Sequence, residues 1–393
     1  MNKLNKLIEE LCPNGVQYKT IGEIATYRRG SFPQPYTNSS YYGGEGAMPF
    51  VQVADIDNEE FKLKDKTKQT ISKIAQPKSI FVPTGTVICS IQGTIGRVAI
   101  TQYDAFVDRT IAIFESFKLD MNKTFFAHCI EVKFGYEKQF ARGSTLKTIT
   151  KEEFTNFAIP VPPIEIQNEI VDKLNYFTDY LKVLNKELIN REKQLEFVMN
   201  KLLKKENFNK FGTLDNICNI EKGKTPIQKN KPGMYPLVAT TEYLQTSDNY
   251  QFDCEAVCLP LISSRGHGVA SISRIYYQSG KFALGNILCA LIPKNNSIKA
   301  EFLRHYLFFF KDQLLVPLMR GGANVALTVD SLKGVIVPIP DVSEQENIIK
   351  KINCVSKLLD KSSGLPAEIE KRQKQYEYYR NKLLSFKEVE VNE

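Results

Sequence analysis

The sequence predicts a mixed α/β fold, in which two similar domains alternate with two long antiparallel coiled-coil helices. Three observations predict it: the chain repeats itself, a heptad-patterned segment follows each repeat, and short β-favouring runs lie between those segments. In the clearest repeat, residues 150–170 reappear as residues 328–348, and Pro338 follows Pro160 by 178 positions (338 − 160). Such a duplication indicates that each half of the chain contacts its own, related site on a partner.

Shorter blocks repeat in the same order along the chain. The matching pairs are 24–33 with 217–226, 125–130 with 302–307, 142–144 with 320–322, and 199–203 with 380–384. Between these blocks the copies differ freely, which favours a common scaffold that carries different loops. The alternative is a duplication whose copies drifted without acquiring separate tasks.

Composition bounds the class of protein. The chain has 393 residues, enough for two or three domains, and its hydrophobic content of 42% suits folded cores. No apolar run reaches the length of a membrane span and the N-terminus lacks a secretory segment, so we expect no membrane contact. Eight cysteines without a disulfide framework indicate a reduced, cytoplasmic protein.

The net charge of +8 comes from 52 basic and 44 acidic residues. Basic residues concentrate in glycine-rich loops, which favours an anionic partner, and nucleic acid is the commonest one. A soluble basic protein without such a partner is the alternative. Cys254 and Cys258 form the only close cysteine pair, and no further ligands follow at zinc-site spacing, so no metal is expected.

The first segment, residues 1–14, is expected to be a short helix, because its leucines and Ile8 fall on one stripe. Its first four residues resemble residues 199–202. The chain therefore begins as if inside the last turns of a long helix. We expect this segment to lie beside the end of the C-terminal helix.

The first α/β domain is expected over residues 15–162, with a β-favouring run at 86–91 and a helix near 123–139. Its glycine-flanked loops contain polar side chains suited to nucleic acid. Arginine reads guanine, glutamine or asparagine reads adenine, lysines and hydroxyls hold phosphates, and glycine permits close approach. Ordinary turns with solvated charge are the alternative. The candidate contact residues are Arg28, Arg29, Gln92, Thr94, Arg97, Arg142, Ser144, Thr145 and Lys147.

The first long helix is expected over residues 163–207. Its apolar positions alternate in steps of four and three, and Arg191 interrupts them once. A helix over residues 165–205 would be roughly 60 Å long at 1.5 Å per residue. Its narrow stripe needs a partner helix, and the seam includes Leu174, Leu181, Leu184 and Leu188.

The second α/β domain is expected over residues 208–340, again with a β-favouring run, at 256–259, and one helix, near 299–315. Its loops correspond to those of the first domain. The candidate contact residues are Lys222, Lys224, Arg265, His267, Arg320 and Asn324.

The second long helix is expected over residues 341–388, with Ser343 as its N-cap and Glu346 completing a capping box. Arg372 takes the place of Arg191, but the offset has grown to 181 (372 − 191). The insertion of three residues near Gly364 predicts a break and a restarted helix. The two arginines are expected to make interhelical contacts or to face solvent. The seam residues are Ile352, Leu359, Ile369, Tyr376 and Leu383.

Catalytic motifs are not evident. Of three histidines, His128 and His305 coincide between the copies, and we interpret them as packed or capping residues. The glycines at 93 and 96 lack the residues that complete a phosphate-binding P-loop. No methyltransferase motif or nuclease carboxylate cluster is evident, so the chain is not expected to be an enzyme.

The whole arrangement resembles the specificity subunit of type I restriction–modification systems. The resemblance rests on residues 157–167, on residues 335–345 and on both heptad helices, and it covers nearly the full length. It implies that each variable domain is a target-recognition domain that reads half of a bipartite sequence in double-stranded DNA. It implies that the helices set the spacing and dock two methylation subunits, with restriction/translocase subunits joining the complex.

The resemblance further implies a subunit without an active site of its own. No cofactor is expected on this chain, because S-adenosylmethionine, ATP and magnesium would be bound by the partner subunits. Two alternatives stay open from the sequence. One is a specificity subunit of a related system that cuts without ATP-driven translocation, and the other is a tandem-repeat coiled-coil protein with no DNA role.

Overall fold

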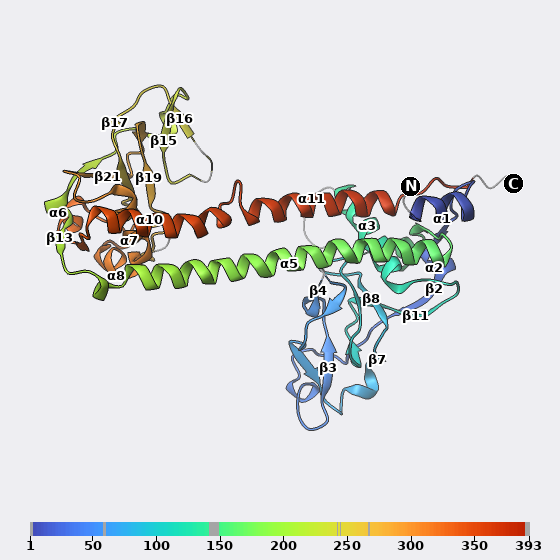
Figure 1. Ribbon diagram of the computed structural model, residues 1–393. Coiled ribbons are helices and arrows are strands. Elements are labelled where there is room, and N and C mark those ends of the chain that lie inside the picture. Colours follow the sequence, from blue (N-terminus) through green and yellow to red (C-terminus); the bar gives the residue numbers. More distant parts are fainter. Residues whose placement is uncertain are drawn as a thin grey trace. The chain divides into compact units, whose positions relative to one another are not determined.

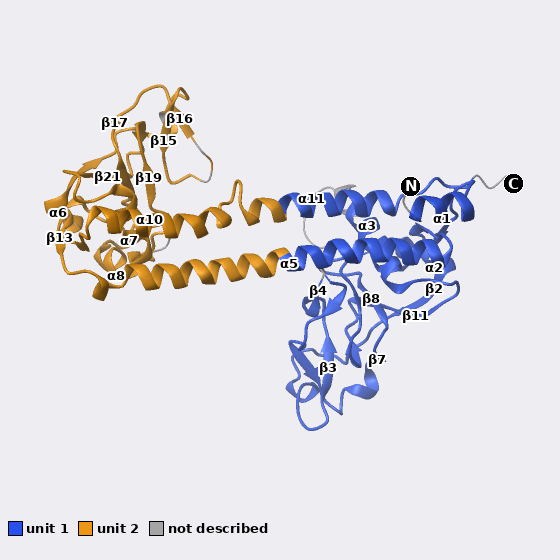
Figure 2. Cartoon of the chain, viewed as in Figure 1, with its two compact units in different colours: residues 1–183, 370–393 blue, residues 184–369 orange. Residues whose placement is uncertain are grey.

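The computed structural model describes residues 3–57, 60–140, 149–241, 243, 245–265 and 268–389. The chain divides into two compact units, which Figure 2 colours separately. Unit 1 comprises residues 1–183 and 370–393, and unit 2 comprises residues 184–369. Two helices take part in both units: α5 (Ile164–Leu203) and α11 (Leu365–Leu383).

Unit 1 contains the sheets of the first domain (Figure 1). One sheet has the order β6–β3–β10–β7, with β3 (Met48–Val51), β6 (Gln69–Ile71), β7 (Ile80–Val82) and β10 (Ala105–Val107). Another has the order β2–β11–β8–β9, with β2 (Ala25–Arg29), β8 (Val87–Ser90), β9 (Val98–Ile100) and β11 (Ile111–Phe117). Two-stranded pairs join β1 (Tyr18–Thr20) to β12 (Ala158–Pro160) and β4 (Ile56–Asp57) to β5 (Lys62–Leu63). The helices are α1 (Lys3–Leu11), α2 (Ile21–Ile24), α3 (Lys123–Phe140) and α4 (Lys151–Thr155).

Unit 2 repeats both four-stranded sheets and the β1–β12 pair in the same order, and within its described residues the β4–β5 pair has no counterpart. Its four-stranded sheets are β16–β15–β20–β17 and β14–β21–β18–β19, and β13 pairs with β22. The strands are β13 (Phe211–Thr213), β14 (Cys218–Lys222), β15 (Tyr235–Val238), β16 (Gln245–Ser247), β17 (Phe252–Asp253), β18 (Ala256–Pro260), β19 (Tyr276–Gln278), β20 (Lys281–Leu284), β21 (Leu288–Pro293) and β22 (Ile336–Pro338). The helices are α6 (Leu214–Ile217), α7 (Ala300–Phe309), α8 (Lys311–Leu314), α9 (Val329–Lys333) and α10 (Val342–Ser356). The predicted pair of mixed α/β domains is confirmed.

A glycine directly after β2 and another directly after β14 identify equivalent positions in the two units. The N–H of Gly30 donates to the Ile111 carbonyl at 3.0 Å, and that of Gly223 donates to the Leu288 carbonyl at 2.9 Å. A Cβ on either glycine would lie within 2.2 Å of a backbone carbonyl oxygen in the same unit, so a side chain does not fit. Ile111 and Leu288 therefore occupy the same place in the two sheets.

The cores are apolar and rich in phenylalanine. In unit 1, Phe125, Phe126 and Phe134 on α3 are fully buried beneath the sheet. In unit 2, Phe302 on α7 is fully buried in the corresponding cluster. α3 lies where the sequence predicts a helix in the first domain, whereas the helix predicted near 299–315 is divided at Phe310 into α7 and α8. Among the described helices, none is both long and apolar enough to cross a membrane.

A buried glutamine fastens each domain to its long helix, and its bonds are the same in both units. In unit 1, Gln167 on α5 accepts from the N–H of Asn122 at 2.9 Å and donates to the Pro162 carbonyl at 2.8 Å. In unit 2, Gln345 on α10 accepts from the N–H of Lys299 at 2.8 Å and donates to the Pro340 carbonyl at 2.7 Å.

The start of α10 corrects one prediction. The helix begins at Val342, and its N-cap is Asp341, not Ser343. Glu346 forms an ion pair with Lys299 at 2.8 Å, so it does not complete a capping box. Lys299, the residue that precedes α7, therefore contacts both Gln345 and Glu346 in the first turns of α10.

In unit 1, the first half of α5 packs against α11 in antiparallel orientation. The ring of Phe177 stacks on Tyr379 at 5.7 Å, and the Arg372 guanidinium lies 5.9 Å from the ring of Tyr180. The residue numbers of the contacts therefore rise along α5 while they fall along α11. Leu181 is buried in the same apolar cluster. This orientation confirms the predicted antiparallel helices. Of the predicted seam, Leu174, Leu181, Ile352 and Tyr376 are buried, and Leu184, Leu188, Leu359, Ile369 and Leu383 are half-buried.

In unit 2, the second half of α5 shares an apolar cluster with α10, and Leu203 and Ile352 are both nearly inaccessible there. The second long helix is broken where the insertion predicts a break. A 3-10 turn ends at Leu359, and α11 starts at Leu365 with Pro366 in its first turn. The Asp360 carboxylate closes the break by accepting from Ser362 and Ser363, and these bonds lower its pKa to about 2.

The arginines that interrupt the heptads bond within their own helices. Arg191 pairs with Glu187 at 2.8 Å and donates to the Gln194 carboxamide at 2.6 Å. Arg372 donates to the Gln375 carboxamide at 2.8 Å, besides lying over Tyr180. The predicted interhelical contact is therefore found for Arg372, within unit 1.

Candidate nucleic-acid interface

The first candidate pair stands at the end of β2 in unit 1. Arg28 and Arg29 are exposed, and Arg28 forms an ion pair with Glu115 on the neighbouring strand β11 at 2.7 Å. Arg29 donates to the Ile149 carbonyl at 3.4 Å. Both border a cavity of about 200 Å³ that Lys151 also lines. The structure thus gathers three basic side chains at this edge of the sheet.

The loop between β8 and β9 contains Gln92, Thr94 and Arg97. Thr94 is exposed and Gln92 is half-buried. The Ser90 hydroxyl closes the loop, since it donates to the Thr94 carbonyl at 2.7 Å and accepts from the Arg97 N–H at 2.9 Å. The loop therefore presents Gln92 and Thr94 on a fixed turn.

Arg97 is partly committed to the protein itself. Its Nη1 donates to the carbonyl oxygens of Val53 and Ile56, each at 3.3 Å. Val53 is the first residue of a 3-10 turn (Val53–Asp55), and Ile56 is the first residue of β4, which follows that turn. These bonds give Arg97 a positioning role in unit 1.

Five predicted contact residues lie outside the described residues. They are Arg142, Ser144, Thr145, Lys147 and His267. Ile149, which follows the first four, donates its N–H to the Ile91 carbonyl at 3.3 Å. The described chain therefore resumes next to the Gln92 loop.

In unit 2, Lys222 ends β14, Lys224 follows it two residues later, and both are exposed. The carboxamide of Gln251 holds their backbone in place. It donates to the Lys222 carbonyl at 2.9 Å and accepts from the Lys224 N–H at 2.8 Å. The lysine-bearing turn is thus anchored through its main chain, and neither side chain is needed to hold it.

The structure brings the other two candidate loops of unit 2 together. The N–H of Ser263 donates to the Val325 carbonyl at 2.9 Å, and the N–H of Leu327 donates to the Leu261 carbonyl at 2.7 Å. These bonds place exposed Arg265 beside the loop that contains exposed Arg320 and Asn324.

Arg320 resembles Arg97 in being partly committed to backbone. Its Nη1 donates to the carbonyls of Pro317 at 2.6 Å and Met319 at 3.0 Å. Asn324, by contrast, has an exposed side chain on the same loop. Arg265 and Asn324 are therefore the better placed of the unit 2 candidates to reach a ligand.

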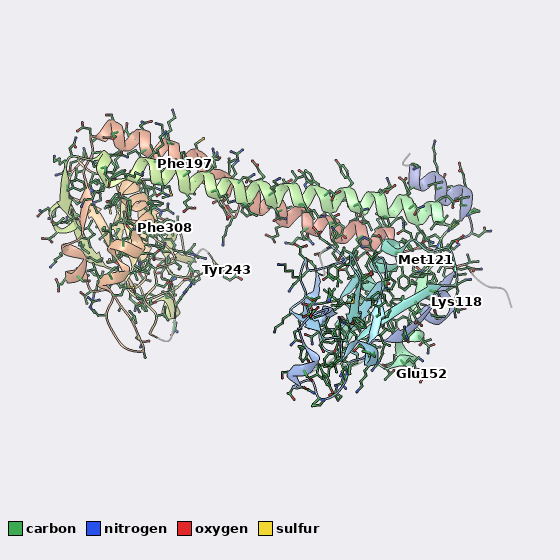
Figure 3. The ribbon with its side chains drawn as sticks, turned by 90° about the horizontal axis from the view of Figure 1, so that it is seen from below. Lys118, Met121, Glu152, Phe197, Tyr243 and Phe308 are labelled. Carbon is green, nitrogen blue, oxygen red and sulfur yellow. The ribbon has the colours of Figure 1, made fainter. Side chains whose placement is uncertain are left out.

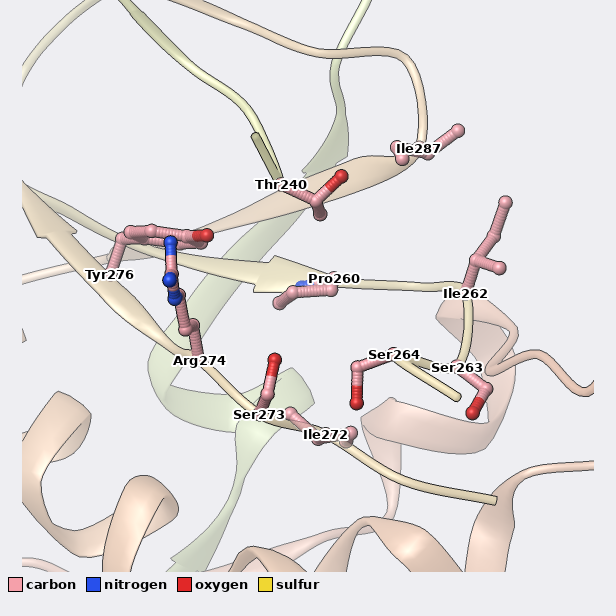
Figure 4. A pocket seen from close by; sticks show the side chains of 10 residues that line it. All are labelled: Thr240, Pro260, Ile262, Ser263, Ser264, Ile272, Ser273, Arg274, Tyr276 and Ile287. Atoms are coloured by element: carbon pink, nitrogen blue, oxygen red, sulfur yellow. The ribbon is translucent and has the colours of Figure 1, made fainter. Parts of the chain in front are cut away.

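Sequence reasoning missed Arg274. It borders a pocket of about 370 Å³ beside these loops (Figure 4), whose polar lining is Thr240, Ser263, Ser264, Ser273, Arg274 and Tyr276. Arg274 has no glycine next to it, so a search for glycine-flanked charges passes over it. The repeat offers a signal, because Arg274 follows Arg97 by 177 positions (274 − 97), the offset that separates Leu288 from Ile111 (288 − 111).

The two coincident histidines are buried, and the prediction of a packing role agrees with their surroundings. Burial lowers the pKa of His128 to about 3, and burial together with Arg304 lowers that of His305 to about 4. His305 Nε2 lies 3.0 Å from the Asn353 Oδ1. Both rings are therefore neutral at neutral pH. The described residues contain no group of three or more potential metal ligands.

The family model and the most similar proteins point to the same family. Residues 13–193 and 206–371 match the family described as type I restriction modification DNA specificity domain. The chain is 30% identical over 302 residues to the type I restriction enzyme EcoR124I/EcoR124II specificity subunit of Escherichia coli, covering 69% of this chain and 74% of that protein. It is 30% identical over 241 residues to a putative type I specificity subunit of Mycoplasma pneumoniae, covering 57% and 91%.

Solved structures show the same fold at low identity. The S subunit of a type I restriction–modification system from M. genitalium matches with a TM-score of 0.58 and 16% identity, covering 95% of this chain and 96% of that one. A chain from a structural study of type I R-M system assembly matches with a TM-score of 0.61 and 15% identity, covering 95% and 97%. Both matches extend over the duplicated domains and the long helices.

Proposed function

Since this chain belongs to the family of type I restriction–modification DNA specificity subunits, we propose that each of its two target-recognition domains reads one half of a bipartite DNA sequence. As a specificity subunit it is the non-catalytic part of the type I complex. Family membership also sets aside the alternative of a tandem-repeat protein with no DNA role.

The observation that carries the proposal is one scaffold used twice with different outward residues. The four-stranded sheets agree strand for strand, and Gln167 and Gln345 fasten both copies alike. Strand β2 ends at Arg29 and strand β14 ends at Lys222, so both end on a basic residue. The exposed residue just before that end is the basic Arg28 in unit 1 and the acidic Glu221 in unit 2. Equal scaffolds with unequal contact surfaces suit two readers of two different half-sites.

The candidate contacts divide between the two domains. We assign Arg29, Gln92 and Thr94, with the residues of the 142–147 loop, to the first half-site. We assign Lys222, Lys224, Arg265 and Asn324 to the second. Arginine and the carboxamides suit base edges, whereas the lysines and hydroxyls suit phosphates.

The long helices are assigned the spacing of the half-sites and the docking of two methylation subunits. Exposed apolar side chains on α5 support docking, because such side chains gain from being covered by a partner. Tyr176 is 75% exposed in unit 1. Phe197, labelled in Figure 3, is 66% exposed in unit 2. Restriction/translocase subunits would join the same complex.

The cofactors of the reaction are assigned to the partner subunits. S-adenosylmethionine and ATP with magnesium would supply the methyl group and the energy there, and this chain would supply sequence choice. All eight cysteines are free thiols, which agrees with the proposed cytoplasmic location.

The test is the pattern of methylated sequences. The chain, assembled with the methylation subunits of its own system, is given a DNA library with randomised sequence. We expect methylation at two defined half-sites separated by a spacer of fixed length. Methylation of a single contiguous sequence would contradict the assignment of one half-site to each domain.

A further inference from the structure

The polar pocket of unit 2 lies between the end of β18 and the start of β19 (Figure 4). Its floor is apolar and includes Pro260, Ile272 and Ile287. Tyr276 is the first residue of β19 and Arg274 precedes that strand by two residues, and both side chains line the pocket. Thr240 enters the lining from the segment after β15.

Several polar groups at this pocket have donors to spare. Arg274 is exposed and makes one bond, from Nη1 to the Thr241 carbonyl at 3.3 Å, whereas a guanidinium carries five N–H donors. Within the described part of the chain, no carboxylate pairs with it. The hydroxyls of Thr240, Ser273 and Tyr276 likewise make no hydrogen bond to a described residue.

Two serines build the wall of the pocket. The Ser263 hydroxyl donates to the Val269 carbonyl at 2.5 Å and accepts from the Ser271 N–H at 3.1 Å. The Ser264 hydroxyl donates to the Ser271 carbonyl at 3.1 Å. These bonds hold the loop that leads to Arg274, so the guanidinium is presented from a fixed backbone.

The residue of unit 1 that is equivalent to Arg274 is identified by the pairing of the strands. Ile88 pairs with Ile113 on one side and Ala99 on the other, while Cys258 pairs with Ala290 and Tyr276. Ile113 lies two residues after Ile111, whose carbonyl accepts from Gly30, and Ala290 lies two residues after Leu288, whose carbonyl accepts from Gly223. Ile113 and Ala290 are therefore equivalent.

Arg97 and Arg274 therefore occupy equivalent positions just before β9 and β19, two residues before Ala99 and Tyr276. Arg97 is bonded to two backbone carbonyls, and alanine takes the place of the tyrosine. Arg274 donates to only one described carbonyl, so more of its guanidinium N–H groups than those of Arg97 can contact a ligand.

From these contacts we propose that the pocket binds a phosphate group of the DNA backbone, with Arg274 as its cationic contact. The proposal rests on the DNA-reading function proposed above. Among the described residues, the lining contains one guanidinium and several hydroxyls but no carboxylate and no carboxamide, so it suits an anion better than the amino groups of adenine or cytosine. Phosphates protrude from a duplex while base edges lie at the floor of a groove, so a recessed set of donors meets a phosphate first.

The test measures DNA binding by the complex of this chain with its methylation subunits. Three duplexes are compared over a series of salt concentrations: the methylated sequence, the same sequence with one base pair changed in a half-site, and an unrelated sequence. Arg274→Ala is expected to raise Kd about ten-fold or more at low salt. The factor should be equal for all three duplexes, and the slope of log K against log salt should become shallower by about 0.9.

Three variants serve as controls. Arg274→Lys keeps the charge and should keep the salt slope. Tyr276→Phe removes only a hydroxyl and should weaken all duplexes by a smaller, equal factor. Lys299→Ala removes another positive charge from unit 2, at a lysine already paired with Glu346, and should leave the slope unchanged.

Three results would overturn the proposal: an unchanged Kd and slope for Arg274→Ala, a loss confined to one base pair, which would make Arg274 a base reader, or an equal slope change for Lys299→Ala. Failure of the proposed function looks different. In that case the unmodified complex itself would not distinguish the three duplexes.

Discussion

The buried glutamines Gln167 and Gln345 show how single residues fix each domain on its helix. Each carboxamide is fully buried and joins the helix to the segment that precedes α3 or α7 and to the last proline of the domain. The repeat makes both glutamines visible in the sequence. Their role was not predicted, because a glutamine at a helix start is equally compatible with exposure to water, and only the folded chain supplies its partners.

Replacing one of these glutamines should destabilise its own unit. Gln167→Ala leaves the Asn122 N–H and the Pro162 carbonyl buried without this partner, at a cost of roughly 2–5 kcal/mol for two such groups. Chemical denaturation followed by circular dichroism measures the loss. Gln373→Ala, at an exposed glutamine of α11, is the matched control and should unfold like the unmodified chain. Equal stability of the two variants would refute the fastening role.

The buried histidines predict a pH dependence of stability. Their folded pKa values, about 3 for His128 and about 4 for His305, lie below the ordinary value of 6.5. The unfolded chain then binds more protons below pH 6.5, so this contribution to stability is complete above pH 6.5 and is lost as the pH falls toward the folded pKa values.

The thermal midpoint is measured between pH 6.5 and pH 5, a range in which carboxylates titrate little. We expect it to fall with pH in the unmodified chain and to fall less steeply in His128→Phe. A variant with the same pH slope as the unmodified chain would show that His128 is already protonated or exposed in the folded state.

At the scale of elements, the heptad rhythm predicted α5 and the seam, and the three-residue insertion predicted the break before α11. The glycine-flanked loops predicted several exposed basic residues, such as Arg29 and Lys222. The capping pattern placed the N-cap at Ser343, two residues after the observed Asp341, and it was wrong because Glu346 pairs with Lys299 and does not cap the helix. Nor could loop composition separate Arg97 from Arg274, because the difference lies in which carbonyls approach each guanidinium.

The seam itself can be tested with a pair of substitutions on α5. Leu181 is buried at 8% exposure in unit 1, and Val183 is 63% exposed two residues further on. Leu181→Asp places a charge among apolar side chains and should cost several kcal/mol, whereas Val183→Asp should cost little. Thermal unfolding of the two purified variants decides between them. Equal midpoints would show that Leu181 does not face the helix partner.

At the scale of the whole molecule, the duplication is the property that matters most. Each unit has its own apolar core, its own sheets and its own loops, so a change in one domain has little physical reason to alter the surface of the other. The sequence predicted this organisation because repeats survive as constant offsets. The bases that are read do not follow from it, because the contact loops are where the copies differ.

The most direct test of two separate readers is a methylation experiment with one altered domain at a time. The assembled complex acts on a library in which both half-sites and the spacer are randomised. One variant combines Arg265→Ala with Asn324→Ala in the second domain, and its counterpart combines Arg29→Ala with Gln92→Ala in the first. A lost base contact costs roughly 1–3 kcal/mol of discrimination, which such a library resolves. We predict that each variant relaxes the preference at one half-site, a different one for each, and leaves the spacer length unchanged. Equal changes at both half-sites from either variant would contradict the account.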